Sequence, residues 1–559
     1  MFGLAAIVQA ERQIVSLSGT WRVTADPDNR GLAQEWHASG RLPAGQPIEV
    51  PGEWETTLGV EYDGVAWYHT RFEVPPAVGQ RVLLRFDAVA TDARVWVNGR
   101  PAGDHVGPWT SFVLDVTDHI EPGQPTNLVV RVDEKVGHNT QGFLPIIAPH
   151  FGGIWQDVSL VLAPPTRLDE LGLVVDASQI DPAAGTGILR VEIPVIGPAK
   201  PSSSIRFTLR DPQGRPIARE SAPVSQSRVQ WTWSGPVQLW DFDKPHLYDL
   251  SIELLDNQGR SLDRVQERVG FRRVTADGPM VRLNGRKCIV RGVLNWGFNP
   301  PSLAPNLSAE QFRKQLRYFK ACGFNLIKFC LWLPPRHILR ITDEEGMLAW
   351  VEYPTWHPTI DAAHRDALVA EYEQMTAHDG NHPSVILRSI TCETGPSADL
   401  EVIRDLYNLI KHRCPGTLVV DDSSWIGWNR IHDFWDDHAY GNNRAWRDSL
   451  RGFERHIKTH GVKPFIMGEA IAADTWPDAP ALTAAPREWA WCLPRWLDAQ
   501  VAFEAALRER FGGDVDPVVS LREQSLRYAM QMRRWQIETY RDQMPQAGYV
   551  VSTMQDVKL

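Results

Sequence analysis

Short apolar runs alternate with helical stretches after Phe271, and this alternation is the strongest constraint on the fold of the chain. Repeated βα units of this kind build a parallel sheet. The expected strands are residues 288–294, 326–329, 348–352, 385–390, 418–421, 433–438, 465–468 and 548–553, with helices that include 308–322, 362–378 and 398–412. Eight such strands with helical connections predict a (β/α)8 barrel.

The chain ends at Leu559, soon after the last expected strand, and too few residues remain for an eighth helix. Either the sequence is a fragment or another element covers that face of the barrel. We favour a fragment or a truncated gene model.

The first half of the chain is rich in short β-forming runs and nearly free of helical periodicity. Asn98-Gly99 follows one such run, and Asn-Gly is a strong signal for a type I′ hairpin turn. Residues 12–163 therefore predict a jelly-roll β-sandwich. Residues 164–273 carry a second set of regularly spaced strands, which predicts an immunoglobulin-like β-sandwich. The barrel would then occupy residues 274–559.

Composition narrows the classes of partner. The net charge of -10 leaves no basic surface for nucleic acid, and no later segment is long and apolar enough to span a membrane. The 23 Trp residues could stack on sugar rings or fill the cores of the β-rich domains. The six Cys residues show no metal-ligand spacing, and His105, His138 and His150 lie apart in the sequence. We therefore expect no metal site and no cofactor.

The N-terminus is a short apolar run that ends in small residues, with Val8-Gln-Ala10 as a candidate cleavage site. This run resembles the end of a secretory signal but lacks the usual basic start. It favours a periplasmic or secreted protein and leaves the cytoplasm open.

Two glutamates follow two of the expected barrel strands. Glu393 comes just after the run at 385–390, and Glu469 directly follows the run at 465–468. Catalytic groups of (β/α)8 barrels lie at the C-terminal ends of the strands. Two carboxylates facing each other there are what a retaining glycosidase requires. Surface ion pairing of one or both side chains is the structural alternative.

Motifs along nearly the whole chain resemble glycoside hydrolase family 2, which includes β-galactosidases, β-glucuronidases and β-mannosidases. The motifs are Leu84-Arg-Phe-Asp87, Ala93-Arg-Val-Trp-Val-Asn-Gly99, Phe112-Val-Leu-Asp-Val-Thr-Asp118, Gly152-Gly-Ile-Trp-Gln-Asp157, Pro245-His-Leu-Tyr248, Gly270-Phe-Arg272, Asn284-Gly285 and Arg291-Gly292. The resemblance implies that Glu393 is the acid/base and Glu469 the nucleophile. Their closeness is expected to raise the pKa of Glu393 and keep it protonated.

Two positions depart from the family pattern. Cys392 stands where the family has an Asn that bonds the sugar 2-hydroxyl, and a thiol is a weak hydrogen-bonding group. Arg388 replaces a common Trp. These changes imply slower catalysis or an unusual sugar.

Other side chains are expected at the same rim of the barrel and complete the predicted substrate site. They are Asn295, Trp296, Lys328, Trp332, His438, Tyr440 and Trp476. His438 and Tyr440 could orient the nucleophile or touch the sugar, or His438 could simply bond the backbone. Trp476 could form a sugar platform or pack in a core.

Two partners are possible for Lys328. It could pair with the carboxylate of an acidic sugar such as a uronic acid, or with a neighbouring acid such as Glu352. We favour the second.

The sequence thus predicts a retaining exo-β-glycosidase acting on terminal β-linked sugars of oligo- or polysaccharides. The alternative is a catalytically impaired carbohydrate-binding protein on the same scaffold. Which sugar is bound, and whether the chain forms a homo-oligomer, stay open.

Overall fold

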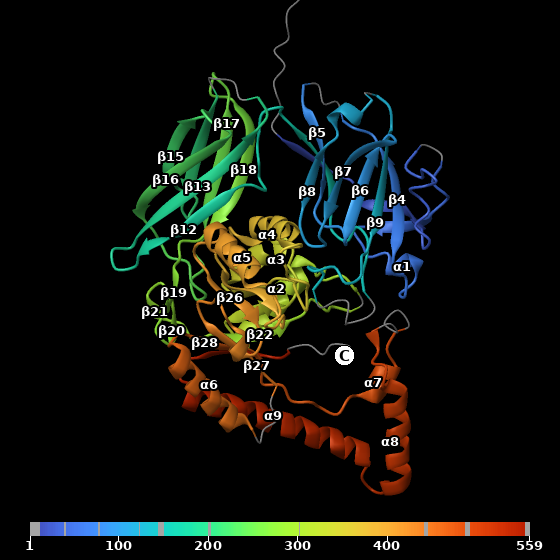
Figure 1. Cartoon of the computed structure of the whole chain (residues 1–559), viewed down its shortest axis with the longest axis vertical. Helices are drawn as coiled ribbons and strands as arrows, with labels where there is room; N and C mark the ends of the chain where they lie inside the picture. Colours follow the sequence, from blue (N-terminus) through green and yellow to red (C-terminus); the bar gives the residue numbers. More distant parts are fainter. Residues whose placement is uncertain are drawn as a thin grey trace, which may run out of the picture.

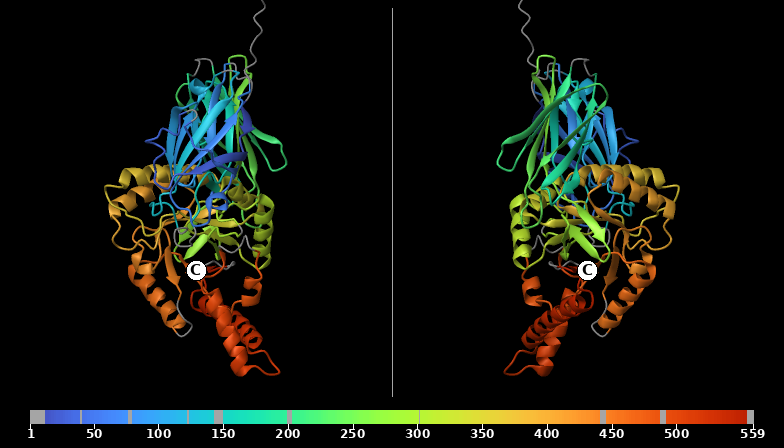
Figure 2. Two further views of the ribbon diagram at one scale, coloured as in Figure 1. Left: turned by 90° about the vertical axis from the view of Figure 1, so that its right-hand side faces the viewer. Right: turned by 90° about the vertical axis from the view of Figure 1, so that its left-hand side faces the viewer.

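A computed structural model describes residues 12–38, 41–75, 79–121, 123–142, 150–198, 203–300, 302–440, 445–486 and 492–553. The signal-like run at residues 1–10 lies outside this range. Two β-sandwiches sit side by side at one end of the barrel, and a helical arm extends from the other end (Figures 1 and 2). No helix in the described part is both long and apolar enough to cross a bilayer.

The first domain is a sandwich of two antiparallel sheets, ordered β1-β10-β5-β8 and β3-β2-β4-β9-β6-β7. Alternate apolar side chains of both sheets meet in one core that includes Trp21, Tyr68 and Phe86. Its elements are β1 (Gln13–Ser16), β2 (Gly19–Ala25), β3 (Gln46–Val50), α1 (Glu55–Leu58), β4 (Val65–Phe72), β5 (Arg81–Phe86), β6 (Asp92–Val97), β7 (Arg100–Val106), β8 (Phe112–Asp115), η1 (Thr117–His119), β9 (Thr126–Asp133) and β10 (Val158–Ala163). Asn98 has φ 51° and Gly99 has φ 77°, as the predicted hairpin turn between β6 and β7 requires.

The second domain is also a β-sandwich. One sheet joins β12, β13 and β16, with β11 also on β13, and the other has the order β15-β14-β17-β18. Phe207 of β14 stacks on Trp231 of β16 at 5.0 Å between ring centroids, which ties the two sheets together. Its strands are β11 (Arg167–Leu168), β12 (Val174–Asp181), β13 (Thr186–Ile196), β14 (Ser204–Arg210), β15 (Pro216–Pro223), β16 (Arg228–Pro236), β17 (Tyr248–Leu255) and β18 (Ser261–Val269).

A small sheet leads into the barrel, made of β19 (Val274–Asp277), β20 (Met280–Leu283) and β21 (Arg286–Lys287). The barrel sheet has eight strands in the order β26-β25-β24-β23-β22-β29-β28-β27, with parallel pairing throughout. Its strands are β22 (Arg291–Asn295), β23 (Leu326–Phe329), β24 (Leu348–Glu352), β25 (Val385–Cys392), β26 (Leu418–Ser423), β27 (Trp435–Ala439), β28 (Phe465–Ala470) and β29 (Gly548–Val551). The predicted fold class is confirmed, and every expected barrel strand is present.

Helices connect the barrel strands. They are α2 (Ala309–Ala321), α3 (Arg336–Glu345), α4 (Arg365–Asp379), α5 (Leu400–Arg413), η2 (Ile426–Trp428), α6 (Trp446–His460), α7 (Ala479–Thr483), α8 (Leu497–Phe511) and α9 (Pro517–Gln543). Helix α2 begins with a full capping box, in which Ser308 and Gln311 satisfy each other's backbone N–H groups.

The connection between β28 and β29 carries α7, α8 and α9. Near its end α9 contacts the barrel, where Tyr540 Oη donates to the Gly548 carbonyl at 2.6 Å. Its other half and α8 form the arm that projects from the barrel (Figure 1). Large apolar side chains remain exposed on this arm, among them Phe503, Phe511, Val515 and Met530.

The sandwiches are joined to the barrel through buried polar contacts. The guanidinium of Arg272, at the end of the second domain, donates to the carbonyls of Pro383 and Val385 at 2.9 Å each and also to that of Gly416. The first domain reaches loops at the C-terminal face of the barrel, where Asn139 Nδ2 donates to the Thr359 carbonyl at 3.1 Å. Loops of the first domain therefore take part in the rim of the barrel.

Arg388 of β25 points away from the barrel interior. Its buried guanidinium pairs with the carboxylate of Asp379, at the end of α4, at 3.2 Å. The next residue, Ser389, faces inward and accepts a hydrogen bond from Trp350 Nε1 at 2.6 Å, as strand alternation requires. Arg388, which stands where the family commonly has Trp, thus lies in the layer between the barrel sheet and its surrounding helices.

We predict that Arg388→Met lowers the free energy of unfolding by roughly 3–5 kcal/mol, because it leaves the Asp379 carboxylate buried without its cation. The matched double variant Arg388→Met/Asp379→Asn should recover a large part of this loss. Thermal unfolding of the wild type, both single variants and the double variant checks the coupling. Strictly additive losses would contradict it.

Candidate active site

Two glutamates lie at the C-terminal rim of the barrel, on strands that are fourth and seventh in chain order. Glu393 follows β25, and Glu469 lies near the end of β28. Glu393 has φ 49°, a left-handed conformation that costs a non-glycine residue about 1–3 kcal/mol. Its N–H donates to the Ser423 carbonyl at 3.0 Å, and the Asp422 carboxylate accepts from the next backbone N–H, that of Thr394, at 3.0 Å. The rim is therefore built to hold Glu393 in a strained position.

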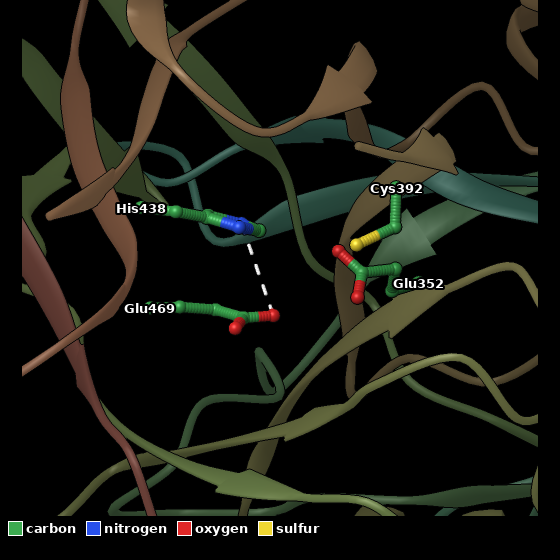
Figure 3. A group of neighbouring side chains, drawn as sticks. All are labelled: Glu352, Cys392, His438 and Glu469. Carbon is green, nitrogen blue, oxygen red and sulfur yellow. Dashed lines mark ion pairs between the residues drawn. The ribbon is translucent and has the colours of Figure 1, made fainter. Parts of the chain in front are cut away.

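His438 lies between the two glutamates. Its Nδ1 is 2.9 Å from Glu393 Oε1, and its Nε2 is 3.8 Å from Glu469 Oε1. The register of β27 against β28 shifts between Asp437 and His438, and such irregularities re-aim side chains beside active sites. Figure 3 shows His438 and Glu469 joined by their ion pair and facing Glu352 and Cys392. The two carboxylates are thus held at opposite edges of one imidazole ring.

Glu469 is kept ionised. Burial alone would raise its pKa, but the charges of His438 and Lys328 outweigh burial and lower the pKa below its ordinary value. Tyr440 Oη donates a hydrogen bond to Glu469 Oε2, and Lys328 Nζ lies 3.5 Å from Oε1. Burial and the charge of Glu469 raise the pKa of the Tyr440 phenol, so it stays a donor. A buried, oriented carboxylate of this kind is suited to act as a nucleophile.

The expected rise in the pKa of Glu393 is wrong for the free site. Burial and the charge of Glu469 do raise this pKa, but the hydrogen bond and charge of His438 outweigh them and lower it. Burial lowers the pKa of His438, whereas Glu469 and Glu393 together raise it to about 9. At neutral pH the proton therefore rests on His438, and Glu393 is a carboxylate.

Lys328 pairs with acidic side chains of the protein itself. Its Nζ lies 2.8 Å from Glu352 Oε2, donates to Ser423 Oγ at 2.9 Å and sits 4.6 Å from the centre of the Trp350 ring. The side chain is fully buried, and the charges of Glu352 and Glu469 overcome its burial to raise its pKa well above the ordinary value. The structure favours the pairing with Glu352 over contact with an acidic sugar.

The other predicted residues divide into two groups. Cys392 is buried, and its sulfur lies within 4.8 Å of ligand atoms of Glu352, His438 and Glu469, so it faces the site. Trp296 Nε1 donates to Cys330 Sγ at 3.0 Å and also borders the site.

Three predicted residues are engaged in packing. Trp332 is buried with its Nε1 bonded to the Asn295 carbonyl at 3.0 Å, while Asn295 Oδ1 accepts from the Gly297 N–H. Trp476 Nε1 donates to Glu504 Oε1 of α8 at 2.9 Å. The long insertion after β28 draws Trp476 into the helical arm, which favours the packing alternative.

Four residues of the site were not identified from the sequence. Cys330 donates to Glu352 Oε1 at 3.0 Å, Ser423 Oγ donates to Asp436 Oδ2 at 2.6 Å, and Trp356 Nε1 donates to Glu393 Oε2 at 3.3 Å. Cys330 and Ser423 each lie at the C-terminal end of a barrel strand, and this position could have identified them from the sequence as residues of the site. No comparable sequence signal pointed to Trp356, or to Asp436 as a residue that faces the barrel interior.

The cluster of Glu352, Cys392, His438 and Glu469 has donor atoms close enough to hold a metal ion. However, Lys328 already lies within 3.5 Å of both carboxylates, and His438 carries a second positive charge. Because these cations offset the charge of the acids, and protonated His438 has no free lone pair on its ring nitrogens, the cluster offers little attraction for a metal ion. Ion pairs among these side chains, rather than a metal ion, balance the charges of the cluster.

Residues 14–164 match the family described as glycosyl hydrolases family 2, sugar binding domain, and residues 172–272 match glycosyl hydrolases family 2. A β-glucuronidase of Paenibacillus borealis is 25% identical over 428 residues, which cover 69% of this chain and 69% of that protein. A β-galactosidase of Arthrobacter sp. (strain B7) is 30% identical over 410 residues, which cover 68% of this chain and only 36% of that protein.

Solved structures show the same fold. The β-glucuronidase from Ruminococcus gnavus in complex with D-glucuronic acid has a TM-score of 0.76 at 18% identity, over 98% of this chain and 92% of that chain. Bacteroides uniformis β-glucuronidase 2 covalently bound to cyclophellitol-6-carboxylate aziridine has a TM-score of 0.75 at 18% identity, over 98% of this chain and 65% of that one.

The raised pKa of His438 predicts a pH-dependent contribution to stability. Its folded pKa of about 9 exceeds the unfolded value of about 6.5, so protonated His438 stabilises the fold fully below about pH 6.5 and loses this effect as pH rises through about 9. The melting temperatures of wild type and His438→Gln should therefore converge between pH 6.5 and 9.5. A gap that stays constant or widens would contradict the assignment.

Proposed function

The chain belongs to glycoside hydrolase family 2, and from this premise we propose that it is a retaining exo-β-glycosidase acting on terminal β-linked sugars of oligo- or polysaccharides. The observation that carries the proposal is the placement of Glu393 and Glu469 on either side of His438. Similar proteins are named β-glucuronidase and β-galactosidase, which makes β-glucuronides and β-galactosides the first substrates to test.

In the first step, Glu469 attacks the anomeric carbon and forms a glycosyl ester while the bond to the leaving oxygen breaks. Lys328, His438 and Tyr440 keep this carboxylate ionised and oriented. In the second step, water attacks the anomeric carbon, its proton passes to Glu393, and Glu469 is released as a carboxylate.

Glu393 must hold a proton to protonate the leaving oxygen, yet it is ionised in the free site. His438 Nδ1, at 2.9 Å from Glu393 Oε1, can supply that proton directly. The Glu393–His438 pair then titrates as one unit with a shared proton. His438 acts through Glu393 and is a positioning residue and proton reservoir for the general acid.

Substrates of different leaving-group basicity test this proposal. Glu393→Gln should lower kcat/KM by about 10²–10⁴-fold on an unactivated disaccharide, because that leaving group needs a proton. A dinitrophenyl glycoside of the same sugar should lose far less, since its leaving group departs as an anion. His438→Gln should show the same selectivity in milder form, whereas the matched surface variant His460→Gln should behave as wild type. Equal losses on both substrates, or none, would contradict the proposed roles.

A second test concerns Cys392. Hydrogen bonds to the sugar 2-hydroxyl strengthen in the transition state and can be worth several kcal/mol, and the thiol supplies little of this. Cys392→Asn should therefore raise kcat on substrates with a free 2-hydroxyl by about tenfold or more. The matching 2-deoxy glycoside should gain nothing. A loss of kcat on both substrates would show that the thiol is itself required.

The impaired-hydrolase alternative has lost part of its support. Arg388 lies outside the site, and the lowered pKa of Glu469 supports its proposed role as an ionised nucleophile.

A further inference from the structure

A second cluster of metal-ligand side chains lies in the first domain, far along the sequence from the catalytic glutamates. Asp63 precedes β4 and Glu134 follows β9, where these two strands pair through Val65 and Asp133. The N–H of Glu134 donates to the Gly64 carbonyl at 3.0 Å, so both acids are fixed at one corner of the sheet. His150, which the sequence placed among isolated histidines, joins them there.

The three side chains converge. His150 Nδ1 lies 3.4 Å from Asp63 Oδ1 and 3.5 Å from Glu134 Oε1. One donor atom from each residue lies within 4.8 Å of those of the other two. A single ion with bonds of about 2.0–2.2 Å could contact all three donors after small side-chain shifts.

Glu134 shows that the cluster needs a positive charge. Its side chain has 0% exposure, and neither carboxylate oxygen has a hydrogen-bond partner among the residues that the structure describes. A buried carboxylate without a hydrogen bond is costly unless a cation compensates it, and the His150 ring, 3.5 Å away, is its ion-pair partner only when it is protonated. The neighbouring Lys135 does not serve, because its Nζ is bonded to Asp92 at 2.7 Å.

A second buried acid, Glu55, lies near Glu134. Glu55 accepts the Gly152 N–H on Oε1 at 2.9 Å, while its Oε2 is buried without a hydrogen-bond partner in the described part of the chain. Glu55 thus places a second buried carboxyl group beside the loop that carries His150.

We propose that Asp63, Glu134 and His150 bind a divalent cation of the Zn²⁺ type. Imidazole together with carboxylates suits Zn²⁺, whereas Ca²⁺ and Mg²⁺ prefer ligand sets made only of oxygen. The set comes from two connections of the first domain, the one before β4 and the one between β9 and β10, so the ion fixes these two connections to each other.

The first domain also meets the rim of the barrel at Gly142, eight residues before His150 in the sequence. The backbone of Gly142 packs so closely on Leu331 that an added Cβ would lie 2.1 Å from the Leu331 carbonyl oxygen. Leu331 directly follows Cys330 of the active site.

The test uses the whole chain, stripped of metal by a chelator and titrated with Zn²⁺ by calorimetry and thermal unfolding. Wild type should bind one tight equivalent and melt at a higher temperature with Zn²⁺. Asp63→Asn and His150→Ala should bind at least about 100-fold more weakly, since loss of even an outer-shell partner costs about 10–100-fold. The matched control Asp104→Asn, which removes an exposed carboxylate from β7, should bind as wild type does.

Two further measurements keep the proposal open to refutation. Asp63 is half-exposed (54%), so Asp63→Asn should fold normally even if a change at Glu134 does not, and its metal-free melting temperature checks this. Co²⁺ in place of Zn²⁺ should show no thiolate charge-transfer band. Equal Zn²⁺ affinity in wild type and Asp63→Asn, or a thiolate band that marks one of the cysteines as the ligand, would overturn the proposal.

Discussion

The active site depends on one imidazolium held between two carboxylates. Protonated His438 contacts Glu393 on one edge and Glu469 on the other, and Lys328 provides a second positive charge between Glu352 and Glu469. In a buried setting, three carboxylates without these two cations would repel one another strongly. The cations thus permit a dense group of acids at the rim of the barrel, and they leave Glu469 ionised.

The same arrangement separates the roles of the two catalytic candidates. Glu469 is almost fully buried, with 6% of its side chain exposed, whereas Glu393 is 20% exposed. Burial with fixed cations suits a nucleophile, and partial exposure beside a proton-bearing imidazole suits an acid that must also take a proton from water. The strained backbone at Glu393 and the register shift at His438 are the local features that bring these side chains together.

Much of the fold and part of the site followed from sequence patterns. The alternation of strands and helices predicted the barrel, and the position of Glu393 and Glu469 after apolar runs predicted that both lie at one rim. The sequence did not reveal that His438 would reverse the pKa shift of Glu393, because the register shift that aims His438 depends on pairing between strands. Trp476 packs with the helices inserted between β28 and β29. No local sequence pattern determines how these helices are placed, so the sequence could not predict this contact. The convergence of Asp63, Glu134 and His150 likewise arises from pairing of strands that are distant in sequence.

The most direct test of the account is covalent trapping. A slow 2-fluoro glycoside of the preferred sugar should form a glycosyl ester on Glu469, and peptide mass spectrometry would locate it on the peptide that contains Met467-Gly-Glu469. The adduct should form far more slowly in Glu469→Gln and should turn over when a sugar acceptor is added. An adduct on Glu352 or Glu393, or turnover with inversion at the anomeric carbon and no adduct, would contradict the assignment of Glu469 as the nucleophile.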